Sequence, residues 1–142
     1  MEILEKVAAW LESFPLWDGE KLTIDSIGPA PGSLGLFPMG VEEISRREDV
    51  LGNLETVNRL TLKLCRVSNG NSALAAHWLL ALQDWVNRKN AAGQLPRIGD
   101  LPGRTRIQAK QGQLTAPAQT GTGRYALIIT VEFVTTANEI SI

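Results

Sequence analysis

The sequence has little material for sulfur or imidazole chemistry. Its 142 residues include one cysteine, Cys65, and one histidine, His77. A single cysteine excludes an internal disulfide and indicates a reducing compartment or no redox dependence. One cysteine and one histidine also argue against zinc, which takes three or four Cys, His or acidic ligands. Nothing in the sequence pairs Cys65 with His77 as a nucleophile and its base, so we expect no catalytic dyad and no cofactor or metal.

Long apolar runs and phosphate-binding motifs are also missing. No stretch reaches the roughly 18 apolar residues of a membrane span, so we expect none. The first residues, MEILEKVAAWLESF, carry three glutamates, whereas a signal peptide has a basic start and an unbroken apolar run. Neither G-x-x-x-x-G-K-[ST] nor G-x-G-x-x-G occurs. We therefore do not expect an enzyme.

What is present fits one globular domain over residues 1–142. The sequence is 44% hydrophobic and 20% charged, which is typical of folded chains rather than disordered ones. A chain of this length buries about 68–70% of its unfolded surface, so it needs no disulfide to hold a core.

The net charge of −1 hides an uneven distribution. Residues 1–56 contain eleven acids and four bases, whereas residues 57–142 contain four acids and ten bases. One interpretation is that the two halves fold against each other and neutralise. The other is a subunit with an acidic and a basic face, which can associate head to tail and close into a ring. A pI near 5.8 and few aromatics among the bases argue against nucleic acid as a partner.

Two helices are predicted from apolar periodicity. The first covers residues 2–14 and ends at Pro15, because proline disfavours helix at the residue before it. The second lies within residues 72–92, where Asn71 or Ser72 can cap its start and Gly93 suits its end.

The second helix carries two tryptophans beside the lone histidine, in the stretch AAHWLLALQDWVNRKNAAGQLP. At about 100° per residue, Trp78, Leu82 and Trp85 fall on one side. We interpret this stripe as packing rather than as an aromatic box around a catalytic imidazole. His77 falls at the border of the polar face, and Leu80 points outward, as a surface leucine or a partner contact.

Strands are predicted from alternation and β-branched content at 21–27, 41–47, 55–67, 104–112 and 124–134. A short edge strand at 33–37 is an option inside a proline-rich loop over 28–40. Residues 113–123 are predicted to be a loop, and residues 135–142 a loose or weakly paired tail. Alternation in 55–67 places Leu62 toward the core and Cys65 on an outer, largely solvated face.

These elements predict an α+β fold, in which a mostly antiparallel sheet has two helices packed on one face. The residues expected to share its core are Leu60, Leu62, Leu64, Leu127, Ile129, Val131, Trp78, Leu82 and Trp85.

The candidate interface consists of two charged groups. The acidic group lies in a charged turn and comprises Glu42, Glu43, Glu48 and Asp49; the basic group lies on one face of the predicted strand 104–112 and comprises Arg104, Arg106 and Lys110. Neighbouring acids on an exposed loop are often only solvated, and the bases form either an ordinary polar strand face or a site for phosphate or an acidic partner. If the two groups are complementary, they are the surfaces through which subunits would meet.

Four segments, taken in order, resemble a family of small minor-tail proteins of long-tailed bacteriophages and prophages. They are LTIDSIGPAPGSLGLFP (22–38), RLTLKLCR (59–66), WLLALQDWVNRKNAAGQLPRIG (78–99) and RYALIITVEFV (124–134). Family members show a strand with an Ile-Asp pair, a loop with Pro and Gly-Ser, a strand ending in Arg, a helix ending near W-x-x-x-x-N-x-x-G-x-L-P, and a late strand. The matching positions are Ile24, Asp25, Pro31, Gly32, Ser33, Arg66, Trp85, Asn90, Gly93, Leu95 and Pro96.

The resemblance implies a structural virion component of the tail-terminator or tail-completion type. Such proteins form a homo-oligomeric ring, with a hexamer as one candidate stoichiometry, at the end of the tail tube, and they contact other tail or head-connector proteins. The implied location is the virion tail, and the bacterial host cytoplasm during assembly. The shared positions are scaffold, so no functional residue is carried over, and the loop at 44–53 departs from the family pattern. The alternative is a monomeric adaptor that binds a phage or host protein through a sheet edge.

Overall fold

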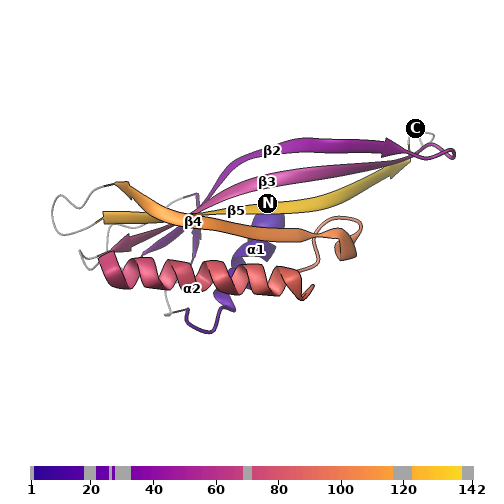
Figure 1. Ribbon diagram of the computed structural model, residues 1–142. Coiled ribbons are helices and arrows are strands. Elements are labelled where there is room, and N and C mark those ends of the chain that lie inside the picture. Colours follow the sequence, from indigo (N-terminus) through magenta and orange to yellow (C-terminus); the bar gives the residue numbers. More distant parts are fainter. Residues whose placement is uncertain are drawn as a thin grey trace.

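The computed structural model describes residues 2–17, 22–25, 27, 33–68, 72–116 and 123–138. Its elements are α1 (Glu2–Glu12), β1 (Thr23–Ile24), β2 (Leu34–Glu48), β3 (Asn53–Ser68), α2 (Ser72–Ala91), the short 3₁₀ helix η1 (Pro102–Arg104), β4 (Arg106–Ala116) and β5 (Gly123–Asn138). One sheet contains all five strands in the order β1-β2-β3-β5-β4 (Figure 1). Every pairing is antiparallel except that of β1 with β2.

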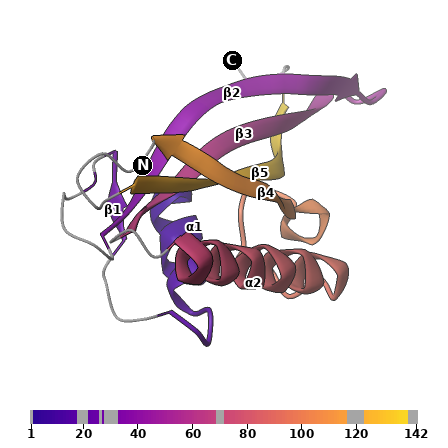
Figure 2. The ribbon, with the colours of Figure 1, turned by 60° about the vertical axis from the view of Figure 1, so that its left-hand side comes forward.

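Both helices lie on one face of this sheet (Figure 2). The predicted α+β class, with a mostly antiparallel sheet, is therefore confirmed. The strand side chains that face the helices join the helix side chains in one core cluster. Every residue expected in the core belongs to it, with Trp78 packed against it as a partly buried member.

Aromatic rings fill the space between the two helices. The Trp85 ring centroid lies 4.9 Å from that of Trp10 and 5.5 Å from that of Phe14. Trp78 meets the Phe14 ring edge-on at 5.8 Å. The tryptophans are therefore packing residues, as the helical stripe predicts. His77 is exposed, and so is Leu80.

The end of α2 follows from its glycine. Gly93 has a φ of +70°, a conformation that costs other residues energy but not glycine. The Gly93 N–H donates to the Asn90 carbonyl, and the Gln94 N–H donates to the Lys89 carbonyl. This pair of bonds is the Schellman pattern, which satisfies carbonyls that the end of a helix leaves without partners.

The second strand is the largest departure from the predicted elements. The loop over 28–40 and the strand over 41–47 were expected to be separate, with a short edge strand at 33–37 as an option. That option matches the start of β2, but β2 runs without a break from Leu34 to Glu48. Pro38 is tolerated because β1 pairs only with Gly35 and Leu36, so beyond them β2 forms the edge of the sheet. Two register shifts, at residues 38–40 and 43–45, mark β-bulges.

Other boundaries also differ from the prediction. Arg104 belongs to η1 and not to the strand, because β4 begins at Arg106. β4 and β5 extend into the predicted loop at 113–123 and the predicted tail, where β5 pairs with β3 as far as Asn138. Residues 117–122 and 139–142 lie outside the described residues. β1 is only two residues long and is followed by Asp25 in a left-handed conformation (φ 63°), which Asp adopts more readily than most residues.

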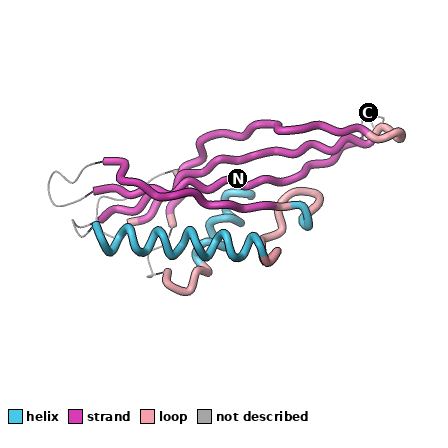
Figure 3. The backbone as a smooth tube through the Cα atoms, in the orientation of Figure 1, coloured by secondary structure: helices cyan, strands magenta, loops and turns pink. Residues whose placement is uncertain are grey.

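Beyond the helices, β2, β3 and β5 continue as a projecting arm (Figures 1 and 3). We define the arm as residues 39–59 and 132–138. Every residue from 38 to 51 is exposed. At about 3.3 Å per residue, the exposed stretch of β2 over residues 38–48 spans about 35 Å. The helices therefore cover only part of the sheet, and the arm has water on both faces along β2.

Replacing Trp85 with Ala should lower the free energy of unfolding by about 3–5 kcal/mol, because it leaves a cavity between the helices and the sheet. Chemical denaturation measures the change. Leu80→Ala on the exposed side of α2 is the matched control and should cost under about 0.5 kcal/mol. Equal losses for the two variants would contradict the packing role of Trp85.

Candidate protein–protein interface

Two of the predicted interface residues belong to one charged row on the open face of the sheet, the face opposite the helices. Register aligns Glu42, Arg59, Glu132 and Arg106 across β2, β3, β5 and β4. Arg59 forms ion pairs with Glu132 at 2.9 Å and with Glu42 at 3.5 Å. Acids and bases alternate along the row, so these charges largely compensate one another within the chain.

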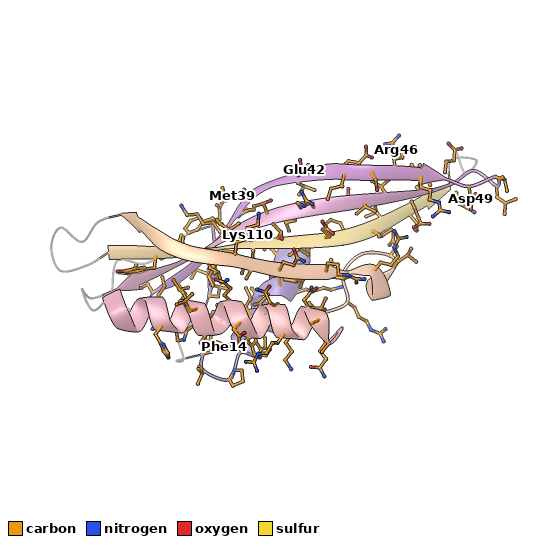
Figure 4. All side chains as sticks on the ribbon, in the orientation of Figure 1. Phe14, Met39, Glu42, Arg46, Asp49 and Lys110 are labelled. Atoms are coloured by element: carbon orange, nitrogen blue, oxygen red, sulfur yellow. The ribbon has the colours of Figure 1, made fainter. Side chains whose placement is uncertain are left out.

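The remaining acids follow β2 to the turn at its end, and Figure 4 shows Asp49 at the tip of the arm. Glu43 is paired with Arg46 at 3.1 Å. Glu48 ends β2, and Asp49 opens the turn at the tip. The structure therefore brings Glu42 close to the Glu43–Arg46 pair but spreads the acidic group along the whole arm.

The remaining bases are separated from one another. Arg104 contacts Glu55 of β3 as an ion pair. Lys110 is exposed on the open face of β4 and is separated from Arg106 by Gln108 on the same face. It has no ion pair within the described residues. The three predicted bases thus lie along one edge of the sheet; Arg104 is paired with Glu55, whereas Arg106 and Lys110 have no ion pair within the described residues.

These contacts bear on the uneven charge of the two halves of the chain. The Arg59–Glu42 and Arg104–Glu55 pairs each join a base from residues 57–142 to an acid from residues 1–56. Because β2 and β3 pair along their length, the halves share one sheet. The first interpretation, in which the halves neutralise each other, therefore accounts for part of the charge difference.

The turn at the tip of the arm is organised by one carboxylate. Asp49 accepts hydrogen bonds from the Leu51 and Asn53 amides, both at 2.9 Å, and from the Asn53 side chain at 3.0 Å. The hydrogen bond from the Asn53 side chain, aided by those two amides, lowers the pKa of Asp49 below its usual 3.8. The turn is therefore held in a defined shape although it lies fully in water.

That turn presents two aliphatic side chains that sequence reasoning missed. Val50 is fully exposed, and Leu51 is 68% exposed. They lie between the acids Glu48 and Asp49 and the turn residue Gly52. An aliphatic pair inside a charged turn is the signal that could have identified them, since solvation alone gives such a turn no reason to be apolar.

A second row on the open face combines apolar and basic side chains. Register aligns Phe37, Lys63, Ile128 and Lys110 across β2, β3, β5 and β4. Like Lys110, Lys63 has no ion pair within the described residues. We call these four residues the lysine row. Its neighbouring row on the arm side consists of Gly40, Thr61, Thr130 and Gln108, and Met39, which is 60% exposed, lies in the bulge of β2 between the two rows.

The opposite edge of the sheet is closed by α2. The Asn87 side chain accepts from the Ala109 amide at 3.0 Å and donates to the Ala109 carbonyl at 3.1 Å. Asn90 accepts from the Ile107 amide at 3.0 Å. These side chains occupy backbone groups of β4 that another strand would otherwise use. Sequence reasoning noted Asn90 as scaffold and missed the role of Asn87.

The base of the arm is braced from the side by the loop after α2. The Asp100 amide donates to the Val134 carbonyl at 2.8 Å, and the Asp100 carboxylate accepts from the Thr136 amide at 2.6 Å. Gly99 passes so close that a Cβ atom there would lie 2.5 Å from the Val134 carbonyl oxygen. Beside this brace, Leu54, Leu101 and Ala137 help to line an open pocket of about 550 Å³.

Cys65 lies on the predicted face of β3 but is buried, so the expectation that it faces solvent is wrong. It is flanked in register by the small residues Gly35 and Ala126, with Val67 also buried on the same face. Within the described ranges, no three His, Cys, Asp or Glu side chains are grouped as a metal site would require. Neither described helix is long and apolar enough to span a membrane.

Comparison of the sequence with protein-family models and with curated proteins gives no match.

Lowering the pH should disorder the turn at the tip only below the pH range in which aspartate side chains usually titrate. Because folding lowers the pKa of Asp49, its contribution is present above pH 3.8 and is lost as the pH falls through the lower value. Amide chemical shifts of Leu51 and Asn53 in a pH titration measure this. A midpoint at or above 3.8 would contradict the hydrogen-bonded turn, and Glu48→Gln should leave the midpoint nearly unchanged.

Replacing Asn87 with Ala should lower the free energy of unfolding by about 1–3 kcal/mol, because it leaves the Ala109 amide and carbonyl without partners. Thermal or chemical denaturation measures the loss. Arg88→Ala on the same helix removes only an exposed pair with Asp84 and should cost under about 0.5 kcal/mol. If Asn87→Ala costs no more than Arg88→Ala, α2 does not secure the edge of the sheet.

Proposed function

We propose that this chain is a structural component of a bacteriophage or prophage tail, of the tail-terminator type, and that it acts by self-association into a ring at the end of the tail tube. The observation that carries the proposal is the arm, together with the order of scaffold segments that resembles the tail family. The arm buries little against its own chain along β2, yet its turn is held by five hydrogen bonds that involve Asp49.

The exposed apolar area of the arm supports a role in assembly. A free arm of about 35 Å with aliphatic side chains at its tip exposes apolar area that a monomer gains nothing by presenting. Bound against a neighbour, the same side chains would leave water and contribute about 25 cal/mol per Å². A projection that leaves one subunit and reaches another can also make a head-to-tail contact, the type that forms a ring when the rotation between subunits closes.

The charged residues of the candidate interface support the same role, but less strongly than the sequence alone predicts, because some of them are paired within the chain. Glu42, Glu43 and Arg104 are paired within the chain, whereas Glu48, Arg106 and Lys110 have no ion pair among the described residues. Rim charges of this kind steer association and select partners more than they add affinity.

The alternative is a monomeric adaptor that binds another phage or host protein through the edge of the sheet. β2 offers such an edge, because no described strand pairs with its outer side beyond Leu36. The two bulges, Pro38 and the charges of β2 are, however, the features by which edge strands avoid pairing. They favour the ring over the adaptor.

Light scattering after size exclusion, from micromolar to near-millimolar protein, tests the proposal. We expect one closed oligomer whose stability falls as salt rises from low to high concentration, because screening weakens exposed charge pairs. Electron microscopy of the same sample should show rings of a single size. A monomer at every concentration, together with a partner recovered from infected cells, would instead support the adaptor.

Charge reversal of Arg104 and Arg106 asks whether these bases take part. Assembly should weaken if they do, whereas unchanged assembly would restrict Arg104 and Arg106 to their contacts within the chain.

A further inference from the structure

The tip of the arm has the properties of a docking element rather than of a solvated turn. Val50 and Leu51 are exposed, and the hydrogen bonds to Asp49 fix the backbone that carries them. Ordering this turn therefore costs little entropy on binding, because the turn is already formed. An aliphatic anchor on a rigid support is one of the arrangements around which a binding interface can be built.

The charge at the tip narrows the choice of surface that it could contact. Glu48 and Asp49 flank the aliphatic pair on its N-terminal side, and Glu48 has no ion pair within the described residues. A receiving surface with apolar area next to positive charge would therefore complement the aliphatic pair and Glu48. An acidic or purely apolar surface would leave the Glu48 carboxylate without a partner.

The lysine row offers that combination on the same chain. Phe37 and Ile128 are half-buried apolar side chains, and Lys63 and Lys110 alternate with them across four strands. Both lysines lack ion pairs within the described residues, unlike Arg59, which the neighbouring acids compensate. No described helix covers this face (Figure 2).

We propose that the tip of the arm of one copy, Val50 and Leu51 with Glu48 and Asp49, docks on the lysine row of a second copy. The aliphatic pair packs on Phe37 and Ile128, and the carboxylates meet Lys63 and Lys110. This inference rests on the proposed self-association and specifies the surfaces that carry it.

Two features of the fold fit this contact. The tip and the lysine row lie at different places on one rigid sheet, because β3 and β5 run through both the body and the arm without a break in their pairing. Each copy therefore both offers a tip and can receive one, and a contact that repeats in this way from copy to copy forms a ring when it closes. The body end of the sheet receives the tip, and β4 contributes Lys110 on the open face while α2 closes its backbone edge.

The test uses two variants of the full chain. Val50→Asp with Leu51→Asp alters the tip, and Lys63→Glu with Lys110→Glu alters the lysine row. Each should abolish the oligomer, even at about 30-fold above the wild-type midpoint, as expected when an interface loses its anchors. The controls are Leu80→Asp, which places an acid on another exposed leucine, and Arg88→Glu with Lys89→Glu, which reverses two charges on α2. Both controls should assemble as the wild type does.

Mixing the two variants gives the sharper readout. The tip variant keeps an intact lysine row, and the row variant keeps an intact tip, so an equal mixture should form a 1:1 dimer and nothing larger. A tip-to-tip contact, by contrast, would leave the row variant assembling alone. Circular dichroism should show that all variants remain folded, since the altered side chains lie on the surface.

The outcomes separate this inference from the proposed function. If the wild type forms closed rings and either variant still does so, the docking surfaces are wrong and the tail role stands. If the mixture yields no dimer although both variants are folded monomers, the head-to-tail contact is also wrong. A wild type that stays monomeric to near-millimolar concentration overturns the contact, and the adaptor then accounts for the arm.

Discussion

The packing of β3 against the helices determines where the rest of the molecule lies. Leu60, Leu62 and Leu64 face α1 and α2 from the centre of the sheet and are fully buried. Because side chains alternate between the faces of a strand, these leucines fix the register of β3, and a slip of one residue would turn all of them outward. β2 and β5 pair with β3 along nearly its whole length, so their positions follow from this register. The open face and the arm are therefore consequences of one buried stripe.

Sequence patterns predicted the elements that depend on local periodicity or on a single strong residue. The stripe of Trp78, Leu82 and Trp85, the end of α2 at Gly93 and the alternation in β3 are all present. In each case the nearest neighbours in the sequence decide the structure. The α+β class follows from the order of these elements.

The same reasoning failed where tertiary pairing outweighs local preference. Nothing in GPAPGSLGLFPMG alone indicates that residues 34–40 join a long strand; β3 supplies the hydrogen bonds that make this possible, and the sheet edge tolerates Pro38. Arg104 was placed on a strand because it continues the alternation of Arg106 and Lys110, but the loop after α2 turns there as η1. The candidate interface was predicted from residue types alone. The sequence does not indicate that Glu42 pairs with Arg59 or that Arg104 pairs with Glu55, because these partners are far apart in the chain.

The continuity of β3 and β5 has a mechanical consequence. Neither strand contains a proline, and only the first residue of β5 is a glycine, so the hydrogen-bonded ladder from the tip to the core has no hinge. A pull on the tip along the strands would load these backbone bonds in shear and distribute the force over many of them at once. The arm would then transmit tension directly to the leucines under the helices, as a stiff strut rather than as a tether.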